Sequence, residues 1–258
     1  MRSVIVCEGN DDLWFIARYL YDTLKWELCQ PEEWCPAYGL SKKRKQDIQY
    51  LISPNKKDTV AVFSSGGQDR IKSLLPDWFN LINKQPLYPI DAIIIFRDCD
   101  DHSPDDLAHD MESWFHISNK WLPSKFTLSN NAISILQAEI DEVDVVVSIL
   151  PVIIPFDEAG AIETLLLEAI EDSSQDGKRI AECARAYIKQ FEDNPLEQYL
   201  RKQRLVTKAK YSAAISVTNP DHSTKLFHQL MESTPWVESA SIKKHIEKVV
   251  QLITGQLQ

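Results

Sequence analysis

Acidic residues follow two short apolar runs of the chain, at the point where each run ends. Glu8 comes directly after the first run, and Asp98 and Asp100 come after the second. Carboxylate oxygens are the ligands that hard divalent cations such as Mg²⁺ prefer. Carboxylates that crowd together repel one another unless a cation compensates their charge. The spacing therefore points to a metal site, to which Asp12, four residues after Glu8, adds a further carboxylate.

Four apolar runs predict the strands that would position these acids. They cover residues 2–7, 58–65, 90–96 and 143–154. Helical patterns separate these runs, which predicts an α/β fold with a mostly parallel four-stranded sheet flanked by helices. Because the carboxyl ends of parallel strands meet at one edge of a sheet, we expect the acids to lie along that edge.

The alternation of strands and helices ends near residue 170, which predicts two regions. Residues 1–170 form the α/β domain, and residues 171–258 form an α-helical C-terminal extension that packs on it. Within the first region, residues 26–58 and 117–142 are expected to be irregular insertions. The second of these insertions also allows an extra hairpin or helix. Helices are predicted over residues 176–192, 195–216, 222–232 and 239–254.

Composition and charge place the chain among ordinary globular proteins. It has 258 residues, a formal charge of −10 and five cysteines without a C-x-x-C pair. We expect reduced thiols and a cytoplasmic protein, since no segment reads as a signal peptide or a membrane span. The acidic balance argues against broad binding of nucleic acid over the whole surface, although a local basic patch or a bound cation can offset it.

Two segments have the composition of a phosphate contact. Gly66 and Gly67 form a strand-to-helix turn, whose backbone amides suit an anion, but no Walker lysine follows them. The densest basic run of the chain has the same potential; a solvated loop is the alternative for it. This run consists of Lys42, Lys43, Arg44 and Lys45.

The order of these motifs resembles the Toprim domain, a Rossmann-like fold. The resemblance rests on Glu8-Gly-Asn-Asp-Asp12, on Gly66-Gly67 and on Asp98-Cys-Asp100, each after a predicted strand. Topoisomerases, DnaG-type primases and OLD-type (overcoming lysogenization defect) nucleases share this domain. The resemblance covers about residues 1–170.

Later residues are similar to the OLD-like and stand-alone Toprim branch. Glu163, in Gly160-Ala-Ile-Glu, matches its downstream acidic motif, and Lys208 or Lys210 lies where OLD-type nucleases carry a lysine. The chain departs from that pattern at Ala161, where the family commonly has a hydroxyl residue.

The resemblance implies metal-dependent phosphoryl transfer with Mg²⁺ or Mn²⁺. Asp98 and Asp100 would hold one metal, and Glu8 would either bind metal or transfer a proton. Asp12 and Glu163 would complete a second metal position. A lysine, either Lys208 or Lys210, would offset charge on the scissile phosphate.

Three functions fit this sequence. The first is a Mg²⁺-dependent Toprim-type nuclease acting on DNA or RNA, as the nuclease subunit of a phage-defence system. Since the chain has no Walker loop, an ABC-type ATPase would be a separate partner protein. The second is a non-catalytic Toprim-like interaction module that binds such a partner. The third is a small phosphohydrolase; a homo-oligomer is compatible with all three, and no membrane partner is expected.

Overall fold

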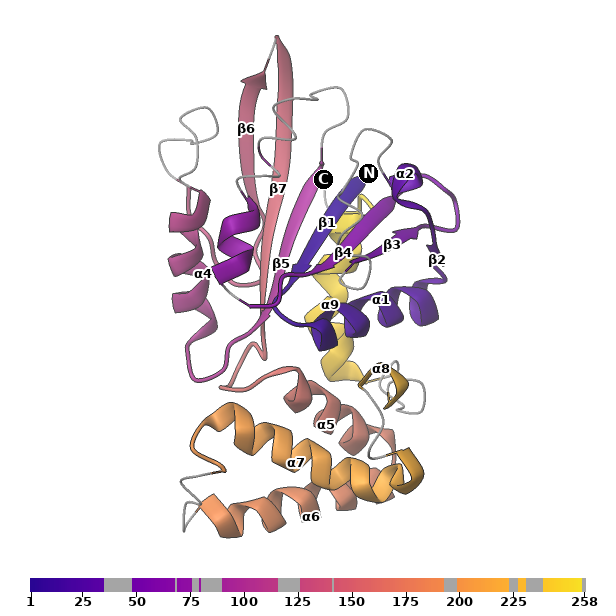
Figure 1. Cartoon of the computed structure of the whole chain (residues 1–258), viewed down its shortest axis with the longest axis vertical. Coiled ribbons are helices and arrows are strands. Elements are labelled where there is room, and N and C mark those ends of the chain that lie inside the picture. Colours follow the sequence, from indigo (N-terminus) through magenta and orange to yellow (C-terminus); the bar gives the residue numbers. More distant parts are fainter. Residues whose placement is uncertain are drawn as a thin grey trace. The chain divides into compact units, whose positions relative to one another are not determined.

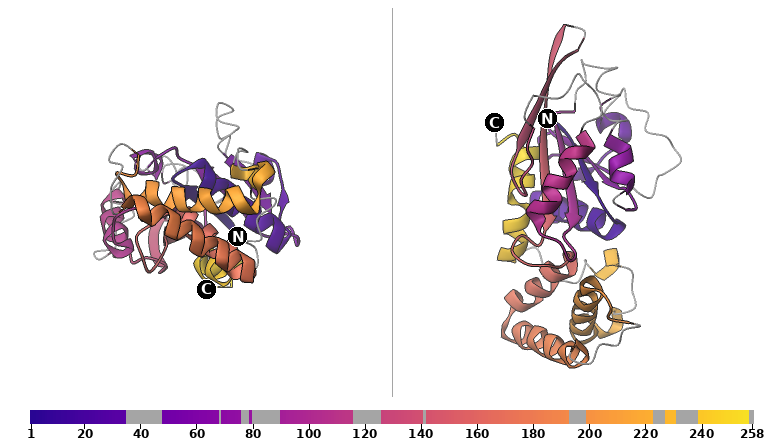
Figure 2. Two further views of the ribbon diagram at one scale, coloured as in Figure 1. Left: turned by 90° about the horizontal axis from the view of Figure 1, so that it is seen from below. Right: turned by 90° about the vertical axis from the view of Figure 1, so that its left-hand side faces the viewer.

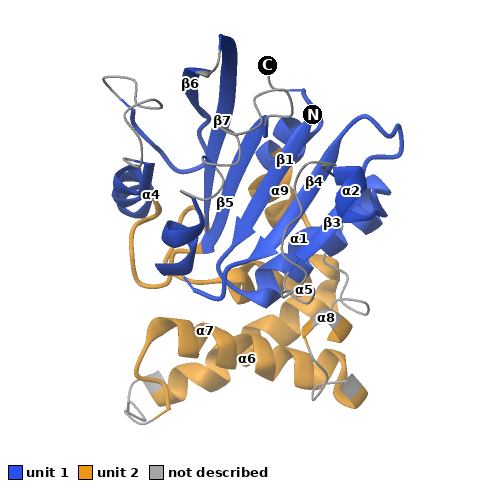
Figure 3. Ribbon diagram, turned by 45° about the horizontal axis from the view of Figure 1, so that its top comes forward, with its two compact units in different colours: residues 1–97, 105–153, 248–258 blue, residues 98–104, 154–247 orange. Residues whose placement is uncertain are grey.

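The computed structural model describes most of the chain. It covers residues 1–34, 48–67, 69–75, 79, 90–115, 126–140, 142–192, 199–222, 227–230 and 239–256. The chain divides into two compact units, shown in Figure 3. Unit 1 consists of residues 1–97, 105–153 and 248–258, and unit 2 consists of residues 98–104 and 154–247.

A mixed seven-stranded sheet has the order β2-β3-β4-β1-β5-β7-β6 (Figure 1). Its strands are β1 (Arg2–Cys7), β2 (Glu27–Leu28), β3 (Ile48–Ile52), β4 (Thr59–Ser64), β5 (Ala92–Asp98), β6 (Ser134–Ile140) and β7 (Val143–Ile154). The central strand β1 is parallel to β4 and β5. The pairs β2–β3, β3–β4 and β6–β7 are antiparallel.

The α/β class is confirmed, but the sheet is larger than predicted and mixed. The four predicted strands correspond to β1, β4, β5 and β7. Three further strands occur where the sequence predicted irregular structure: β2 and β3 lie within 26–58, and β6 lies within 117–142. Strands buried on both faces have continuous apolar runs, whereas strands toward the edges mix apolar and polar residues and are harder to recognise. In β6, Leu136 is buried while its neighbour Ile135 is exposed, and the strand forms the hairpin alternative with β7.

The centre of unit 1 is formed by β1, β4 and β5, whose apolar side chains are almost entirely buried. Helix α1 (Asn10–Leu24) packs on β1, β3 and β4. Its buried residues Leu13, Ile16 and Leu20 recur at helical spacing, so that one face of α1 covers the sheet. Residues 248–253, the end of α9, lie on the opposite face from α1 (Figures 1 and 2).

Shorter helical segments complete unit 1. They are α2 (Pro31–Trp34), residues 69–75, most of α4 (Pro104–Glu112) and the 3₁₀ turn Ser113–Phe115.

Unit 2 is mainly helical. Helices α5 (Ile162–Ser173), α6 (Gln175–Glu192) and α7 (Gln203–Thr218) pack on one another through buried leucine, isoleucine and alanine side chains. The 3₁₀ turn Pro220–His222, α8 (Phe227–Leu230) and most of α9 (Ala240–Ile253) follow. Helix α7 begins at Gln203, later than the predicted residue 195. Among the described residues, no helix has both the length and the apolar character needed to cross a membrane.

Candidate functional site

Glu8 lies at the carboxyl end of β1 in unit 1. Its backbone N–H donates to the carbonyl of Phe96 at 3.3 Å, which places it beside the end of β5. Its Oε2 atom lies 3.6 Å from the Nε atom of Arg97, a buried side chain that is 4% exposed. The guanidinium therefore provides a positive charge next to the Glu8 carboxylate, at the edge where α/β sheets carry their sites.

The predicted glycine turn contacts the same residue. Gly66 and Gly67 have φ values of +74° and +130°, which glycine adopts far more readily than other residues. The Gly67 amide donates to the carbonyl of Glu8 at 2.9 Å, and the Ser65 hydroxyl also donates to that carbonyl. The turn thus fixes the backbone at Glu8, and an anion contact at Gly66 and Gly67 stays a prediction.

Asp12 is buried in the first turn of α1. Its Oδ2 atom accepts the backbone N–H of Gly9 at 2.9 Å, which satisfies a donor at the helix N-terminus. The carboxylate also suits the positive end of the helix dipole. Asp12 therefore has a structural role at α1, and its predicted role as a second-site ligand is untested.

Asp98 has a comparable position in unit 2. Its Oδ1 atom accepts the backbone N–H of Ile162, the first residue of α5, at 2.9 Å. The residue before this helix is Ala161, which has no side-chain acceptor for a helix amide. Asp98 supplies that acceptor from the end of β5, and it brings a carboxylate to the start of α5.

A backbone bridge holds Asp100 next to Gly160. Its N–H and C=O each bond to Gly160 at 2.8 Å, in an antiparallel pair. Asp100 has a φ of +50°, a left-handed conformation that aspartate tolerates better than most residues. A Cβ atom at Gly160 would lie 2.4 Å from the Thr164 Oγ1 atom, so only glycine fits without a shift. The bridge fixes the Asp98–Asp100 turn to the segment that leads into α5.

Cys99 lies between the two acids and faces the same loop. Its thiol lies 3.2 Å from the Glu158 carbonyl and 3.4 Å from the Gly160 carbonyl. Burial raises the pKa of Cys99 to about 11, and the neighbouring carboxylates of Asp98 and Asp100 add to this rise. The thiol is thus protonated at neutral pH and packs in the turn.

Glu163 forms an ion pair with one of the predicted lysines. The Lys208 Nζ atom of α7 lies 2.9 Å from the Glu163 Oε1 atom of α5. The Glu163 side chain is 6% exposed and that of Lys208 is 47% exposed. The second carboxylate oxygen of Glu163, Oε2, is buried and has no hydrogen-bond partner among the described residues.

Of the other predicted basic residues, the structure describes Lys210 but not the run at residues 42–45. Lys210 is half-buried on α7, two residues from Lys208. The basic run of Lys42, Lys43, Arg44 and Lys45 lies outside the described residues.

The predicted residues thus fall into two groups, one in each unit. Unit 1 holds Glu8 and Asp12, and unit 2 brings Asp98, Asp100 and Glu163 to the start of α5. Their donor atoms are all carboxylate oxygens, the type that Mg²⁺ and Mn²⁺ prefer. The buried Glu163 Oε2 atom is such an acceptor, and it has no hydrogen-bond partner in the part of the chain that the structure describes. In the described ranges, no three acidic, histidine or cysteine side chains are already gathered as ligands for one ion.

Comparison with known proteins gives a family. A family model described as "Protein of unknown function (DUF3226)" matches residues 2–253. The chain belongs to the DUF3226 family. A search of curated proteins found no match. The crystal structure of a hypothetical protein from Pyrococcus horikoshii OT3 is similar, with a TM-score of 0.52 and 13% sequence identity over 99% of this chain and 95% of that one. At this identity the likeness shows a shared fold alone.

One residue of the candidate site in this DUF3226 chain was not predicted. Arg97 ends the apolar part of β5 and is buried against Glu8. The signal was present in the sequence, since an arginine directly after five apolar residues is unusual in a buried strand and calls for an acidic partner.

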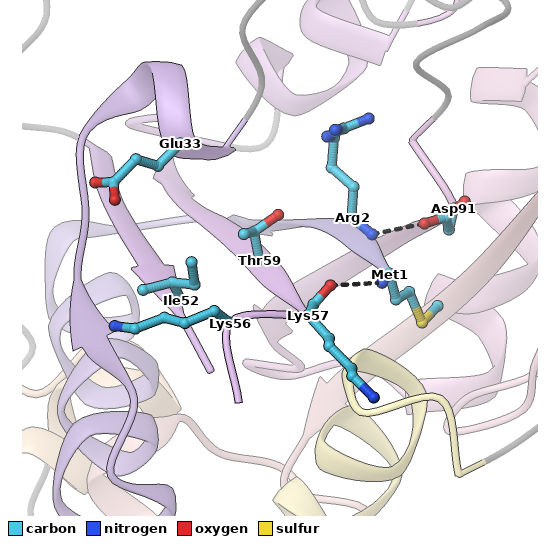
Figure 4. Close-up of a pocket in the computed structure, with 8 residues that line it drawn as sticks. All are labelled: Met1, Arg2, Glu33, Ile52, Lys56, Lys57, Thr59 and Asp91. Carbon is cyan, nitrogen blue, oxygen red and sulfur yellow. Dashed lines mark hydrogen bonds between the residues drawn. The ribbon is translucent and has the colours of Figure 1, made fainter. Parts of the chain in front are cut away.

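A separate cavity of about 400 Å³ lies in unit 1, at the amino ends of the parallel strands (Figure 4). Its lining includes Arg2 and Thr59, at the amino ends of β1 and β4. The figure shows the Arg2 backbone N–H pointing to the Asp91 carboxylate, a 2.6 Å hydrogen bond. Sites of α/β sheets lie at the carboxyl ends of the strands, so this cavity is distinct from the predicted site of the DUF3226 chain.

Proposed function

We propose that this DUF3226 protein is a Mg²⁺- or Mn²⁺-dependent nuclease with a Toprim-like fold. The observation that carries the proposal is the meeting of three sequence motifs in unit 2. Asp98 caps α5 at Ile162, Asp100 bridges Gly160, and Glu163 pairs with Lys208. Residues that are 110 positions apart in the sequence, from Asp98 to Lys208, contribute to one neighbourhood, as phosphoryl-transfer chemistry requires.

Each side chain has a defined task in this proposal. Asp98, Asp100 and Glu163 would hold a divalent cation, and Glu8 would bind metal or take a proton. A bound Mg²⁺ activates water and neutralises charge on the phosphate and the leaving oxygen. Lys208 carries a positive charge next to Glu163 and would neutralise charge on the scissile phosphate. The substrate is DNA or RNA, in the cytoplasm, and a separate ABC-type ATPase is the proposed partner.

The test is a cleavage assay with the purified full-length protein. Labelled single-stranded and double-stranded DNA and RNA are incubated with Mg²⁺, with Mn²⁺ or with EDTA. We expect cleavage that requires the metal and that falls to the EDTA level in Asp98→Asn, Asp100→Asn and Glu163→Gln. Asp106→Asn, an exposed acid on α4, is the matched control and should cleave as the wild type does. Cleavage that persists in EDTA, or in Asp98→Asn, would overturn the proposal.

A non-catalytic interaction module is the second candidate, and one observation favours it. The acids Asp12, Asp98 and Glu163 each have a partner within the protein: the Gly9 amide, the Ile162 amide and Lys208. A purely structural role would explain these contacts without any reaction. Absence of cleavage of all nucleic acids under both metals would select this candidate, whereas hydrolysis of nucleotides but not of polymers would select a phosphohydrolase.

A further inference from the structure

The two side chains of the ion pair between Glu163 and Lys208 differ in their exposure to solvent. The Glu163 carboxylate is buried at the start of α5, whereas the lysine reaches it from a half-exposed position on α7. One carboxylate oxygen faces the ammonium group, and the other is buried without a hydrogen-bond partner among the described residues. Half of the acceptor capacity of this buried charge is therefore unused.

A charged side chain that is buried in a protein is usually paired with an opposite charge or binds a metal ion. In this protein the ammonium group of Lys208 provides that charge at 2.9 Å. Lysine is well suited to be a partner that another cation can displace. Its charge is compact, its side chain is flexible, and it makes no rigid bidentate contact with a carboxylate. Its half-exposed position gives the ammonium group access to water as soon as another cation compensates Glu163.

We propose that Lys208 takes the place of a divalent cation at Glu163 in the metal-free protein, and that metal binding displaces it. This inference rests on the proposed metal site and adds its regulation. A divalent cation and an ammonium group repel each other at one carboxylate, so the two occupants compete. The displaced ammonium group is then available to a phosphate of the substrate. In this way, metal binding at Glu163 would release the Lys208 ammonium group for binding of the nucleic-acid phosphate.

The test measures binding of Mn²⁺ alone, without nucleic acid, by titration calorimetry of the full-length protein. Lys208→Met removes the competing charge and should tighten Mn²⁺ binding roughly tenfold or more, the size of effect that one adjacent charge has on an ionisation equilibrium. Lys208→Arg keeps the charge and should bind Mn²⁺ no more tightly than the wild type. Lys178→Met removes an exposed lysine of α6 in the same unit and should leave the affinity unchanged. Glu163→Gln should weaken Mn²⁺ binding.

A second measurement uses the wild-type protein, in case Lys208→Met does not fold. An amine-reactive reagent followed by mass spectrometry reports the reactivity of each lysine. We expect Mn²⁺ to increase the labelling of Lys208, while the labelling of Lys178 stays constant. An affinity of Lys208→Met equal to or below that of the wild type, or a Lys208 reactivity that Mn²⁺ leaves unchanged or lowers, overturns the inference.

This test separates the inference from the proposed function. If Mn²⁺ displaces Lys208 but no nucleic acid is cleaved, the displacement stands and the nuclease proposal fails. If metal-dependent cleavage is found but Mn²⁺ affinity does not rise in Lys208→Met, the nuclease proposal stands and the displacement fails.

Discussion

The Oδ1 atom of Asp98 accepts the backbone N–H of Ile162 at 2.9 Å, so that a residue at the end of β5 caps the helix that carries Glu163. The same carboxylate is a proposed metal ligand. A substitution at Asp98 therefore affects both helix stability and metal binding, unless it retains an acceptor oxygen.

Asp98→Ala should destabilise the protein, whereas Asp98→Asn should not. Alanine leaves the Ile162 amide without its acceptor, and loss of such a cap costs about 1 kcal/mol, with a range of about 0.5–2 kcal/mol. Asparagine keeps an acceptor oxygen but loses the charge needed for metal binding. Urea denaturation gives the free energy of unfolding, and the cleavage assay gives the activity. Equal stability of Asp98→Ala and the wild type would show that the cap contributes nothing.

Gly160→Ala should be destabilising because the new Cβ atom has no room. It would lie 2.4 Å from Thr164 Oγ1 and 3.2 Å from the Cγ atom of Pro155. Such overpacking costs roughly 1–3 kcal/mol. The double variant with Thr164→Ala removes the closest atom, and a double-mutant cycle of unfolding free energies should give a favourable coupling between the two sites. Additive effects of the two substitutions would contradict the steric explanation.

The stability of the protein should decrease in mild acid because of His245, a buried residue of α9. Its Nδ1 atom lies 2.7 Å from the Ser241 carbonyl, which can only accept, so Nδ1 carries the proton. Its Nε2 atom accepts the backbone N–H of Phe156 at 3.1 Å, so the ring is neutral. Burial lowers the pKa of His245, and the positive charge of Lys244 adds to this, while the Ser241 carbonyl and the carboxylates of Glu168 and Asp157 oppose it.

The sign of the effect follows from proton linkage. The folded His245 has a pKa below its ordinary value of 6.5, so the unfolded chain binds this proton more readily. The free energy of unfolding should therefore fall as the pH falls below 6.5 and on through the folded pKa. In His245→Phe this part of the pH dependence should vanish, whereas His102→Gln, at an exposed turn, should retain it. A series of denaturant titrations from neutral to mildly acidic pH measures the difference.

The cysteines should differ in their reactivity toward iodoacetamide. Cys99 is buried with a pKa of about 11, and burial also raises the pKa of Cys7, so neither thiol is ionised at mildly alkaline pH. Cys183 is exposed on α6 and should be modified first. Peptide mapping of a Cys35→Ser variant, which removes the cysteine outside the described residues, checks the order. Alkylation of Cys99 in the folded protein as fast as that of Cys183 would contradict its place in a packed turn.

The strands of the fold were predictable where consecutive side chains are all apolar. The strands β1 and β5 each contain a continuous run of buried apolar residues, Val4–Cys7 and Ala92–Phe96, and such runs are visible in the sequence. The strand β3 was missed because its residues Ile48–Ile52 include Gln49 and Tyr50 at half-buried positions and pair antiparallel with β4. Nothing local in the sequence marks such pairing, which depends on the partner strand.

The candidate site was predictable as a set of residues but not as a set of contacts. The sequence indicated Asp98 and Asp100, because their type suits a metal and their positions follow a predicted strand, and the resemblance to the OLD-like Toprim branch indicated Glu163. It could not indicate that Asp100 pairs with Gly160 through the backbone, since the two residues are 60 positions apart and the pairing uses no side-chain signal. The sequence left Lys208 and Lys210 as alternatives, and it could not indicate the ion pair between Lys208 and Glu163, which are 45 positions apart.

Because the chain passes more than once between its two units, unit 2 cannot be made as one continuous fragment. Unit 2 includes the seven residues 98–104, which are separated in sequence from the rest of that unit, 154–247. A fragment made of residues 154–247 would leave the Ile162 amide and the Gly160 backbone without the residues that bond to them. Truncation would thus remove two proposed ligands, Asp98 and Asp100, together with the fold that holds them. Point substitutions in the intact chain, rather than excised halves, are the way to assign its activity.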